Sequence, residues 1–376
     1  MRVLCVFGTR PEAVKMAPVI KQLGCHPDRI IPRVWVTAQH REMLDQVLQL
    51  FNLKPNLDLD LMRNGQTPSQ VAGQVLQRLE PHLMQERPDW VVVQGDTTTA
   101  MATAIAAHHL QIRVAHVEAG LRTHDKRNPF PEEMNRVVVD AVSDLHLAPT
   151  SNARLNLLRE GIPDDSIHVT GNTVIDALLE IASRPWDPPD DSPLSALAGG
   201  GESDARVILV TAHRRESFGQ PMRDICTAMR EIALKRGNHV RIMFPVHLNP
   251  NVQGPVRETL GNLANVTLLP PLDYQSLVYL MKRSYLVLTD SGGLQEEAPS
   301  LGKPVLVLRE TTERPEAVEA GTARLVGTNP DRIVGETMKL LDDDTAYSLM
   351  AHAINPFGDG HAAERIVTAL METRAE

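Results

Sequence analysis

Apolar and polar positions follow a pattern that predicts strands and helices in turn. Short runs dense in β-branched residues, each ending at a loop rich in Gly, Thr, Asp or Pro, predict buried strands at 3–7, 33–37, 90–93 and 114–117. Amphipathic stretches between these runs predict helices at 12–23, 42–51, 71–85 and 98–109, and we expect Pro81 to kink or divide the third. Strands that alternate with helices indicate an α/β fold, with a parallel sheet covered on both faces.

The alternation stops at 183–206 and then resumes. This segment holds several prolines, the acidic run Asp187, Asp190 and Asp191, and the triplet Gly199-Gly200-Gly201. Such a composition predicts an exposed connection between domains. Beyond it, apolar runs predict further strands at 207–210, 241–245, 266–269, 285–289 and 304–308. We therefore expect two doubly wound domains, with a ligand in the cleft between them at the carboxyl ends of their strands.

Composition agrees with a folded chain of two domains and excludes several partners. The 376 residues are 42% hydrophobic, and 38 Lys and Arg against 47 Asp and Glu leave a net charge of −9. An acidic chain is a poor partner for nucleic acid or an anionic membrane, so a few local cations and amides would have to bind any phosphate. No apolar run reaches the roughly 18 residues of a membrane span, and the first is too short for a signal peptide, so a cytoplasmic location is expected.

Neither a cofactor nor a metal is expected from the motifs. Cys5, Cys25 and Cys226 are widely spaced, and no His, Cys or Asp cluster has convincing metal spacing. The GxGxxG dinucleotide fingerprint does not follow the first strand. The chemistry therefore has to come from side chains and backbone amides.

Two strand-to-helix turns have the composition of phosphate sites. After the first strand, Gly8-Thr9-Arg10-Pro11-Glu12 and Lys15 combine a glycine turn, a helix start and two cations, although Thr9 as a plain helix cap explains the same residues. In the second half, Ser291-Gly292-Gly293 would let bare amides approach a diphosphate, and Glu297 could accept from ribose hydroxyls. A capped helix with turn glycines is the plainer alternative there. Two glycines at a helix start lower the stability of the helix, so their presence is better explained by a use such as phosphate binding.

Three carboxylates follow strands of the first half. Asp96 and Glu118 come directly after predicted strands, and Glu132 follows Pro131, which is suited to open a helix. Carboxylates gathered at one sheet edge raise one another's pKa and can serve as general acid and base. Each has a structural alternative, such as Asp96 capping the next helix or Glu132 facing a helix dipole. Singly the alternatives are favoured; three carboxylates together favour catalysis.

A histidine and two arginines follow the first strand of the second half. His213, Arg214 and Arg215 form the kind of cluster that stabilises a departing phosphate. His247 ends the next strand, and an isolated histidine carries little information by itself.

Short blocks in order along nearly the whole chain form a specific combination. They lie at 7–12, 95–99, 116–122, 131–136, 171–173, 213–216, 290–297, 311–316 and 355–360. In these blocks the chain resembles the non-hydrolysing UDP-N-acetylglucosamine 2-epimerases. The resemblance implies two Rossmann-like domains of the glycosyltransferase-B kind at 1–170 and 171–360, a last helix at 361–376 that packs back on the first domain, and a homodimer.

The resemblance also implies an activity and the residues that carry it. The reaction would be reversible inversion at C2, interconverting UDP-N-acetylglucosamine and UDP-N-acetylmannosamine without a cofactor and supplying surface polysaccharide synthesis. No carbonyl activates C2, so UDP would leave C1 as the C2 proton leaves, giving 2-acetamidoglucal, and would add back with protonation on the other face. Asp96, Glu118 and Glu132 would transfer the protons, and Arg136 would orient Glu132 through an i,i+4 pair. The family's UDP-contacting positions match Arg10, Lys15, His213, Ser291, Gly292, Gly293, Glu297 and Arg314.

Some members of the family also bind UDP-N-acetylglucosamine beside the substrate as an activator. Gln39, His40 and His247 lie in matching motifs, so such a site is a hypothesis for this chain. Relatives can carry a glutamine and an aromatic residue near the uracil where this chain has Leu272 and Leu277. These leucines remove the stacking partner there and leave the backbone to contact the edge of the base.

Three rival functions share parts of the pattern. A UDP-sugar glycosyltransferase of the same fold would use the same diphosphate site, but it would not need three carboxylates. A hydrolysing epimerase would admit water at C1 and release UDP and N-acetylmannosamine. A non-catalytic sensor of nucleotide sugars would tolerate loss of the carboxylates, whereas here all three positions are filled.

Overall fold

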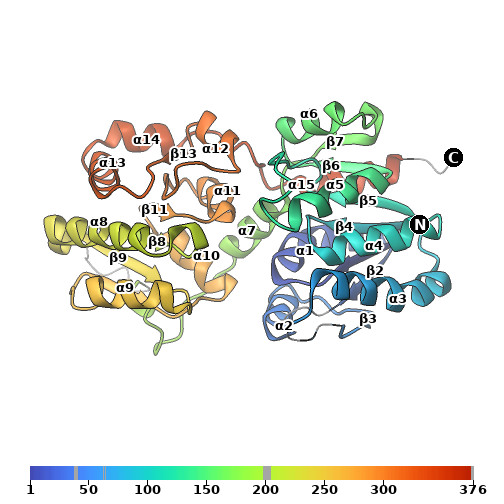
Figure 1. The fold of residues 1–376 in the computed structure, drawn as a ribbon, viewed down its shortest axis with the longest axis horizontal. Helices are drawn as coiled ribbons and strands as arrows, with labels where there is room; N and C mark the ends of the chain where they lie inside the picture. Colours follow the sequence, from blue (N-terminus) through green and yellow to red (C-terminus); the bar gives the residue numbers. More distant parts are fainter. Residues whose placement is uncertain (38–40, 62, 64, 198–204, 374–376) are drawn as a thin grey trace. The chain divides into compact units, whose positions relative to one another are not determined.

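The computed structural model describes residues 1–37, 41–61, 63, 65–197 and 205–373, which divide into two compact units. The N-terminal unit comprises Met1–Ala177 together with Phe357–Glu376, and the C-terminal unit is the continuous segment Leu178–Pro356. In each unit helices pack against a parallel sheet (Figure 1). The doubly wound α/β fold predicted from the sequence is confirmed.

The N-terminal unit is built on a parallel sheet of seven described strands. In the spatial order β3-β2-β1-β4-β5-β6-β7 they are Leu57–Asp58, Ile31–Val36, Arg2–Phe7, Trp90–Gln94, Arg113–Val117, Leu145–Ala148 and Ile167–Val169. β1 pairs with β2 on one side and with β4 on the other, so the winding reverses between β1 and β4. Ligands of doubly wound sheets bind at the carboxyl ends of strands at such a reversal. The loops that begin at Gly8 and Gly95 lie at these two strand ends.

The helices of the N-terminal unit include one from the far end of the sequence. They are α1 (Arg10–Gly24), α2 (Arg41–Leu50), α3 (Pro68–Glu86), α4 (Thr98–His109), α5 (Glu132–Val142), α6 (Ser151–Arg159), the first part of α7 (Thr173–Ser183) and α15 (Ala362–Glu372). α15, red in Figure 1, packs against α1. The N–H groups of Ala362 and Ala363 donate to the Asp176 carboxylate at 3.2 and 2.8 Å. The C-terminal helix therefore packs back on the first domain, as expected.

The C-terminal unit repeats the design with six described strands. In the order β10-β9-β8-β11-β12-β13 they are Val266–Leu269, Val240–Pro245, Arg206–Thr211, Leu286–Thr289, Val305–Val307 and Ala323–Leu325. Its helices are α8 (Gln220–Arg236), α9 (Pro250–Leu260), α10 (Tyr274–Arg283), α11 (Gly292–Ser300), α12 (Pro315–Glu319), α13 (Pro330–Asp342) and α14 (Asp344–Ala351). The winding reverses between β8 and β11, so the loops after Thr211 and Thr289 mark the second expected ligand position.

The apolar runs that predicted the strands form the cores. Val3 through Phe7 of β1 are fully enclosed, as is Trp90 of β4. In the C-terminal unit, β8 and β11 pack with Met222, Met229 and other apolar residues of α8. Burial of a side chain of this size contributes about 1.5–3 kcal/mol, so these strands hold the loops at their ends in fixed positions.

Two local expectations are corrected. Of the two outcomes expected at Pro81, division of the helix is wrong, because α3 runs unbroken from Pro68 to Glu86 with Pro81 inside it; a kink stays a prediction. The segment 183–206 does not connect the units, because it belongs to the C-terminal unit and the chain passes from one unit to the other within α7. Leu194 is buried, and Trp186 packs against Tyr279 of α10. In the described part of the chain, no helix has the length and apolar composition needed to span a membrane.

Gly8→Ala is expected to lower the free energy of unfolding. A Cβ at Gly8 would lie 2.3 Å from Thr37 Oγ1 and 3.1 Å from Thr99 Oγ1, and both threonines are buried. Overpacking of this kind costs about 1–3 kcal/mol, which urea unfolding followed by circular dichroism would measure. Gly73→Ala in α3 is the matched control: its Cβ would meet no atom within 4 Å. That variant should gain up to about 1 kcal/mol, and equal stability of the two variants would contradict tight packing at Gly8.

Candidate functional site

The turn after β1 is a capped helix start tied to the turn after β4. The Thr9 hydroxyl accepts from the Glu12 N–H, and Glu12 Oε2 accepts from the N–H groups of Gly8 at 3.1 Å and Thr9 at 2.8 Å. Glu12 Oε1 accepts from the hydroxyl of Thr97, the cap of α4, at 2.7 Å. Burial raises the pKa of Glu12 even though these hydrogen bonds oppose it. Thr9 is thus the helix cap that the plainer alternative predicted.

Glu118 is the first residue after β5, and three side chains hold its carboxylate. It pairs with the Lys15 ammonium, and it accepts from the side-chain amides of Gln94 at 3.2 Å and Asn172 at 3.1 Å. Its backbone is left-handed with φ at 68°, and its side chain is 8% exposed. The donors come from α1, β4 and the residue before α7, so three separate segments of the chain converge on the Glu118 carboxylate.

Asp96 is bound to a cation on a neighbouring helix. Its Oδ2 pairs with the Arg136 guanidinium on α5, and Asn135 Nδ2 donates to its backbone oxygen at 2.9 Å. The side chain remains 31% exposed, so the carboxylate is held in place and still reaches solvent. The alternative role of Asp96 as a helix cap is wrong, because Thr97 caps α4.

Glu132 opens α5 but is not the partner of Arg136. One nitrogen of Arg136 binds the carboxylate after β4, and another lies 3.4 Å from Glu133 Oε2. Glu133 is buried and accepts from the N–H groups of Thr123 and His124. Among the described residues, the predicted i,i+4 pair is therefore wrong. Glu132 and Glu133, four and three residues before Arg136, are both within reach of Arg136 along the helix. Glu133 is the partner because its carboxylate is held by the neighbouring loop through the Thr123 N–H.

A buried histidine and aspartate lie beneath the loops after β4 and β5. His116 contacts Asp140 Oδ1 at 2.5 Å through Nδ1 and the backbone oxygen of Gly95 at 2.8 Å through Nε2. Asp140 Oδ2 accepts from the Gly120 N–H at 3.2 Å and from Arg122 at 2.7 Å. Burial alone would raise the pKa of Asp140, but the charges of His116 and Arg122 and the His116 hydrogen bond outweigh it and hold the pKa below its ordinary value.

In the C-terminal unit, α11 begins in a way that suits an anion. Ser291 is its N-cap, and within the described chain the Ser291 side chain makes no capping hydrogen bond. A Cβ on Gly292 would lie 3.6 Å from Arg214 Nη2, so a guanidinium stands beside the helix start. Main-chain N–H groups, the helix dipole and a nearby cation together favour a phosphate.

The first turns of α11 also carry an ordered set of charged groups. Glu297 is buried, and its Oε1 accepts from the Tyr274 hydroxyl at 2.9 Å. Burial and the adjacent carboxylate raise the pKa of Tyr274 well above its ordinary value. Arg314 pairs with the buried Glu296 and donates to the backbone oxygen of Glu313 at 3.2 Å. These contacts fix two of the residues expected to bind UDP.

His213 follows β8 and lies beside a buried aspartate. Its Nδ1 is 3.5 Å from Asp290 Oδ1, and its ring stacks on His247 with centroids 5.7 Å apart. Removal from water lowers the pKa of His213; Asp290 acts in the opposite direction, and His247 and Arg214 lower the pKa further.

The structure brings most predicted residues to the carboxyl ends of strands. The N-terminal unit holds Arg10, Lys15, Asp96, Glu118, Glu132 and Arg136, and the C-terminal unit holds His213, His247, Ser291, Gly292, Gly293, Glu297 and Arg314. Gln39 and His40 lie outside the described residues. Leu272 and Leu277 are half-buried near the start of α10.

Sequence reasoning missed three polar partners. Gln94 directly precedes one of the recognised blocks and Asn172 lies within another, so their positions carried a signal. Tyr274 carried none, because its contact with Glu297 joins residues far apart in the chain. Within the residues that the structure describes, no three His, Cys, Asp or Glu side chains converge as metal ligands.

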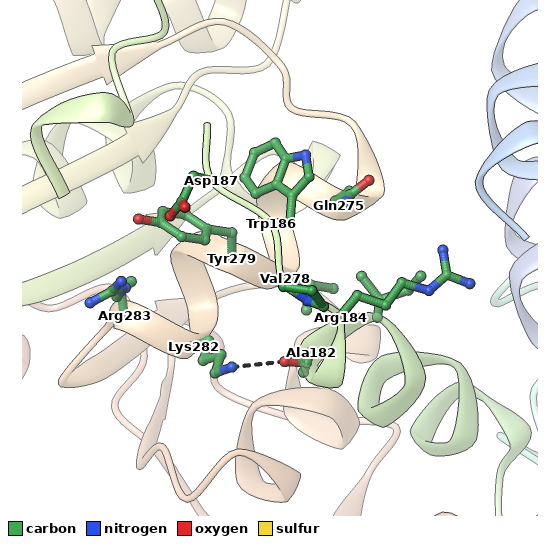
Figure 2. A pocket seen from close by; sticks show the side chains of 11 residues that line it. Ala182, Arg184, Trp186, Asp187, Gln275, Val278, Tyr279, Lys282 and Arg283 are labelled. Atoms are coloured by element: carbon green, nitrogen blue, oxygen red, sulfur yellow. Dashed lines mark hydrogen bonds between the residues drawn. The ribbon is translucent and has the colours of Figure 1, made fainter. Parts of the chain in front are cut away.

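A hollow of about 430 Å³ lies between α10 and the segment after α7, and the sequence did not predict it. Figure 2 shows Trp186 and Tyr279 in it, with ring centroids 5.3 Å apart. Lys282 donates to the Ala182 oxygen at 2.8 Å, and Arg283 lies 5.4 Å from the Tyr279 ring. Both cations belong to the last turn of α10, where the negative end of the helix dipole favours positive side chains. Their presence is therefore explained without a ligand in the hollow.

Comparison with known proteins agrees over nearly the whole chain. A family model described as UDP-N-acetylglucosamine 2-epimerase matches residues 25–371. The UDP-N-acetylglucosamine 2-epimerase of Salmonella typhimurium is 53% identical, and the match covers 100% of this chain and 99% of that protein. A crystal structure from Listeria monocytogenes has a TM-score of 0.91 at 45% identity and covers 98% of this chain and 95% of its own. The Neisseria meningitidis UDP-GlcNAc 2-epimerase, solved bound to UDP-GlcNAc, has a TM-score of 0.88 at 45% identity, with coverage of 99% and 100%.

Two parallel α/β units with polar groups at both reversals of strand order define a nucleotide-sugar enzyme with a glycosyltransferase-B-like fold. The chain belongs to the UDP-N-acetylglucosamine 2-epimerase family and is an isomerase. The resemblance recognised in the sequence is confirmed.

Asp140→Asn is expected to lower the free energy of unfolding at pH 7 by about 3 kcal/mol, because it removes the charge that His116 and Arg122 surround. The folded pKa of Asp140 is lowered, so its contribution is complete above the unfolded pKa of about 3.9 and is lost as the pH falls through the lower folded value. Urea unfolding at several pH values should show the gap to the unmodified protein closing in acid. Asp165→Asn, at an exposed position, is the control and should show no gap. A loss that stays constant with pH would contradict the charge argument.

Proposed function

We propose that this protein interconverts UDP-N-acetylglucosamine and UDP-N-acetylmannosamine reversibly, by eliminating UDP and adding it back. The observation that carries the proposal is the placement of Asp96 and Glu118 at the ends of the neighbouring strands β4 and β5, each paired with a cation. The substrate is inferred from the family and from the Neisseria relative, which was solved with UDP-GlcNAc bound.

UDP has to leave C1 because no carbonyl activates the C2 hydrogen, and inversion needs a base on one face of C2 and an acid on the other. A base takes the C2 proton, the electron pair of that bond forms a double bond between C1 and C2, and the C1–O bond breaks as UDP leaves. The 2-acetamidoglucal then accepts a proton at C2 on the opposite face while UDP adds back at C1. We assign these proton transfers to Asp96, Glu118 and Glu132 as a group, since a positioned acid or base typically contributes about 10²–10⁴ in rate.

The leaving UDP must be held so that it can return. We assign this to the start of α11, where Gly292 and Gly293 present main-chain N–H groups and Ser291 presents its hydroxyl, beside Arg214. His213 would bind the phosphate oxygens, and Glu297 would bind ribose hydroxyls from the position that Tyr274 fixes. Arg314 and Arg10 complete the cations proposed for UDP.

Lys15 and Arg136 have a further part in this proposal. Each is already bound to a carboxylate, Lys15 to Glu118 and Arg136 to Asp96. They therefore couple the position of a substrate anion to the position of a proton-transfer group, which favours elimination in a fixed geometry.

Several expectations from the sequence remain predictions. These are a homodimer, a cytoplasmic location, supply of surface polysaccharide synthesis, and activation by UDP-N-acetylglucosamine at Gln39, His40 and His247. The stacking of His247 on His213 supports placing His247 close to the UDP residues.

Proton NMR in deuterated water, with UDP-N-acetylglucosamine and no added cofactor, is the experiment that tests the reaction. We expect UDP-N-acetylmannosamine to form with deuterium at C2, because the proton removed from one face is replaced by one from solvent-exchanged groups. Release of N-acetylmannosamine and UDP would show the hydrolysing reaction instead. Unchanged substrate with folded protein would contradict the epimerase proposal.

Asp96→Asn, Glu118→Gln and Glu132→Gln should each lower turnover by about two to four orders of magnitude, as loss of a positioned acid or base does. The same NMR assay would measure incorporation of deuterium at C2, and thermal unfolding would show whether each variant is folded. Glu258→Gln, at an exposed position on α9, is the control and should keep normal turnover. Normal turnover in all three site variants would exclude them from proton transfer.

A further inference from the structure

We infer that Asp290 is a positioning residue for His213: its Oδ1 takes the Nδ1–H of the ring and thereby leaves Nε2 to act on the departing UDP. The inference deepens the proposed function and rests on it, because it concerns how His213 is prepared for that role. The observation behind it is a buried carboxylate oxygen, Asp290 Oδ1, that takes no part in the hydrogen bonds of the loop.

One oxygen of Asp290 holds the loop after β8. Oδ2 accepts from the N–H groups of His213 and Arg214, both at 2.8 Å, and from the Ser217 hydroxyl at 3.2 Å. These bonds join the end of β11 to the loop after the neighbouring β8. A neutral amide oxygen, as in asparagine, could accept from the two main-chain donors through its two lone pairs, so the anchoring of the loop does not require a charge.

The other oxygen has no such task. Asp290 is fully buried, and among the described residues its Oδ1 has no hydrogen-bond partner. His213 Nδ1 lies 3.5 Å away. A buried carboxylate oxygen without a donor lowers stability, so an aspartate that only anchored a loop would be poorly suited to this position. The charge and the second oxygen are accounted for if the donor is the imidazole.

The ring of His213 is restrained on a second side. It stacks on the ring of His247 with centroids 5.7 Å apart and an angle of 15° between planes. The Nδ1 of His247 accepts from the Asn249 N–H at 3.1 Å, which fixes that ring in turn. The carboxylate edge and the stacked face together limit rotation of His213.

This arrangement determines which ring nitrogen can act. In a neutral imidazole one nitrogen carries hydrogen and the other accepts, and the partner of one sets the state of the other. With Nδ1–H donated to Asp290, Nε2 takes up a proton to become a donor to a phosphate oxygen. The buried carboxylate then stabilises the imidazolium while UDP carries its extra negative charge.

Asp290→Asn separates this role from the anchoring of the loop. The amide oxygen keeps the bonds from the two main-chain N–H groups, whereas the NH2 group now donates to His213 Nδ1 and selects the opposite tautomer. We expect kcat to fall about a hundredfold or more, by analogy with other positioned acid groups, with a smaller change in KM. Ser217→Ala is the matched control, since it removes one loop bond from Oδ2 without touching Oδ1, and its kcat should stay within about tenfold.

Nitrogen-15 NMR of histidine-labelled protein without UDP, at a pH where the His213 ring is neutral, reads the tautomer directly, with His213 assigned by its loss in His213→Gln. The unmodified protein should show Nδ1–H, and Asp290→Asn should show Nε2–H. An Nε2–H tautomer in the unmodified protein would overturn the inference, and this holds even if the variant does not fold. A fall in kcat without a change of tautomer, or equal to that of Ser217→Ala, would reduce Asp290 to a loop anchor and overturn it as well.

Failure of the proposed function would look different. Unmodified protein that neither binds UDP nor epimerises the sugar would contradict that function, while the tautomer of His213 in the free protein would still report on Asp290. Normal epimerisation with the wrong tautomer would contradict only the positioning role.

Discussion

Loops that follow parallel strands have backbone N–H groups that the sheet does not pair. In both units, buried carboxylates accept hydrogen bonds from these N–H groups. Glu12, Asp140 and Asp290 each accept from main-chain N–H groups of such a loop, and each is almost fully enclosed. A buried charge is tolerated only where several donors surround it, so the loop has one well-defined arrangement around it. These three groups therefore help to define the conformation of the loops at the strand ends.

The same loops carry the residues that we propose to contact the substrate. Glu12 joins the turns after β1 and β4, Asp140 lies under the loops after β4 and β5, and Asp290 joins the ends of β8 and β11. Asp96 and Glu118, which we propose for proton transfer, therefore lie on backbone that is held in place by these buried carboxylates, while their own side chains are paired with cations from helices. Fixed backbone and paired side chains give the proposed acid–base site little freedom to reorganise, which is what the proposed elimination of UDP requires.

The parts of this protein that the sequence predicts are those with local signals. Apolar β-branched runs mark β1 and β4 because a strand covered on both faces has to be apolar throughout. The block around Gly8 marks a turn in which a buried threonine leaves no room for a side chain. The partner of Arg136 was not predictable, because Glu132 and Glu133 are both within its reach along the helix and a loop after another strand decides between them. The proline-rich stretch after α7 misled for a related reason: its composition predicts exposure, yet Trp186 and Leu194 pack into the C-terminal unit.

The path of the chain has a consequence for how the molecule is made. The C-terminal unit is one continuous segment, whereas the N-terminal unit is completed by α15, which follows that segment and packs against α1. On the ribosome the later unit has therefore been synthesised in full while the earlier one still lacks a helix, and Asp176 still lacks the N–H groups of Ala362 and Ala363. The half of the molecule that begins first is finished last, and it is the half that carries Asp96, Glu118 and Glu132. A nascent chain consequently holds the residues proposed for proton transfer in an unfinished fold until nearly all of the sequence has been translated.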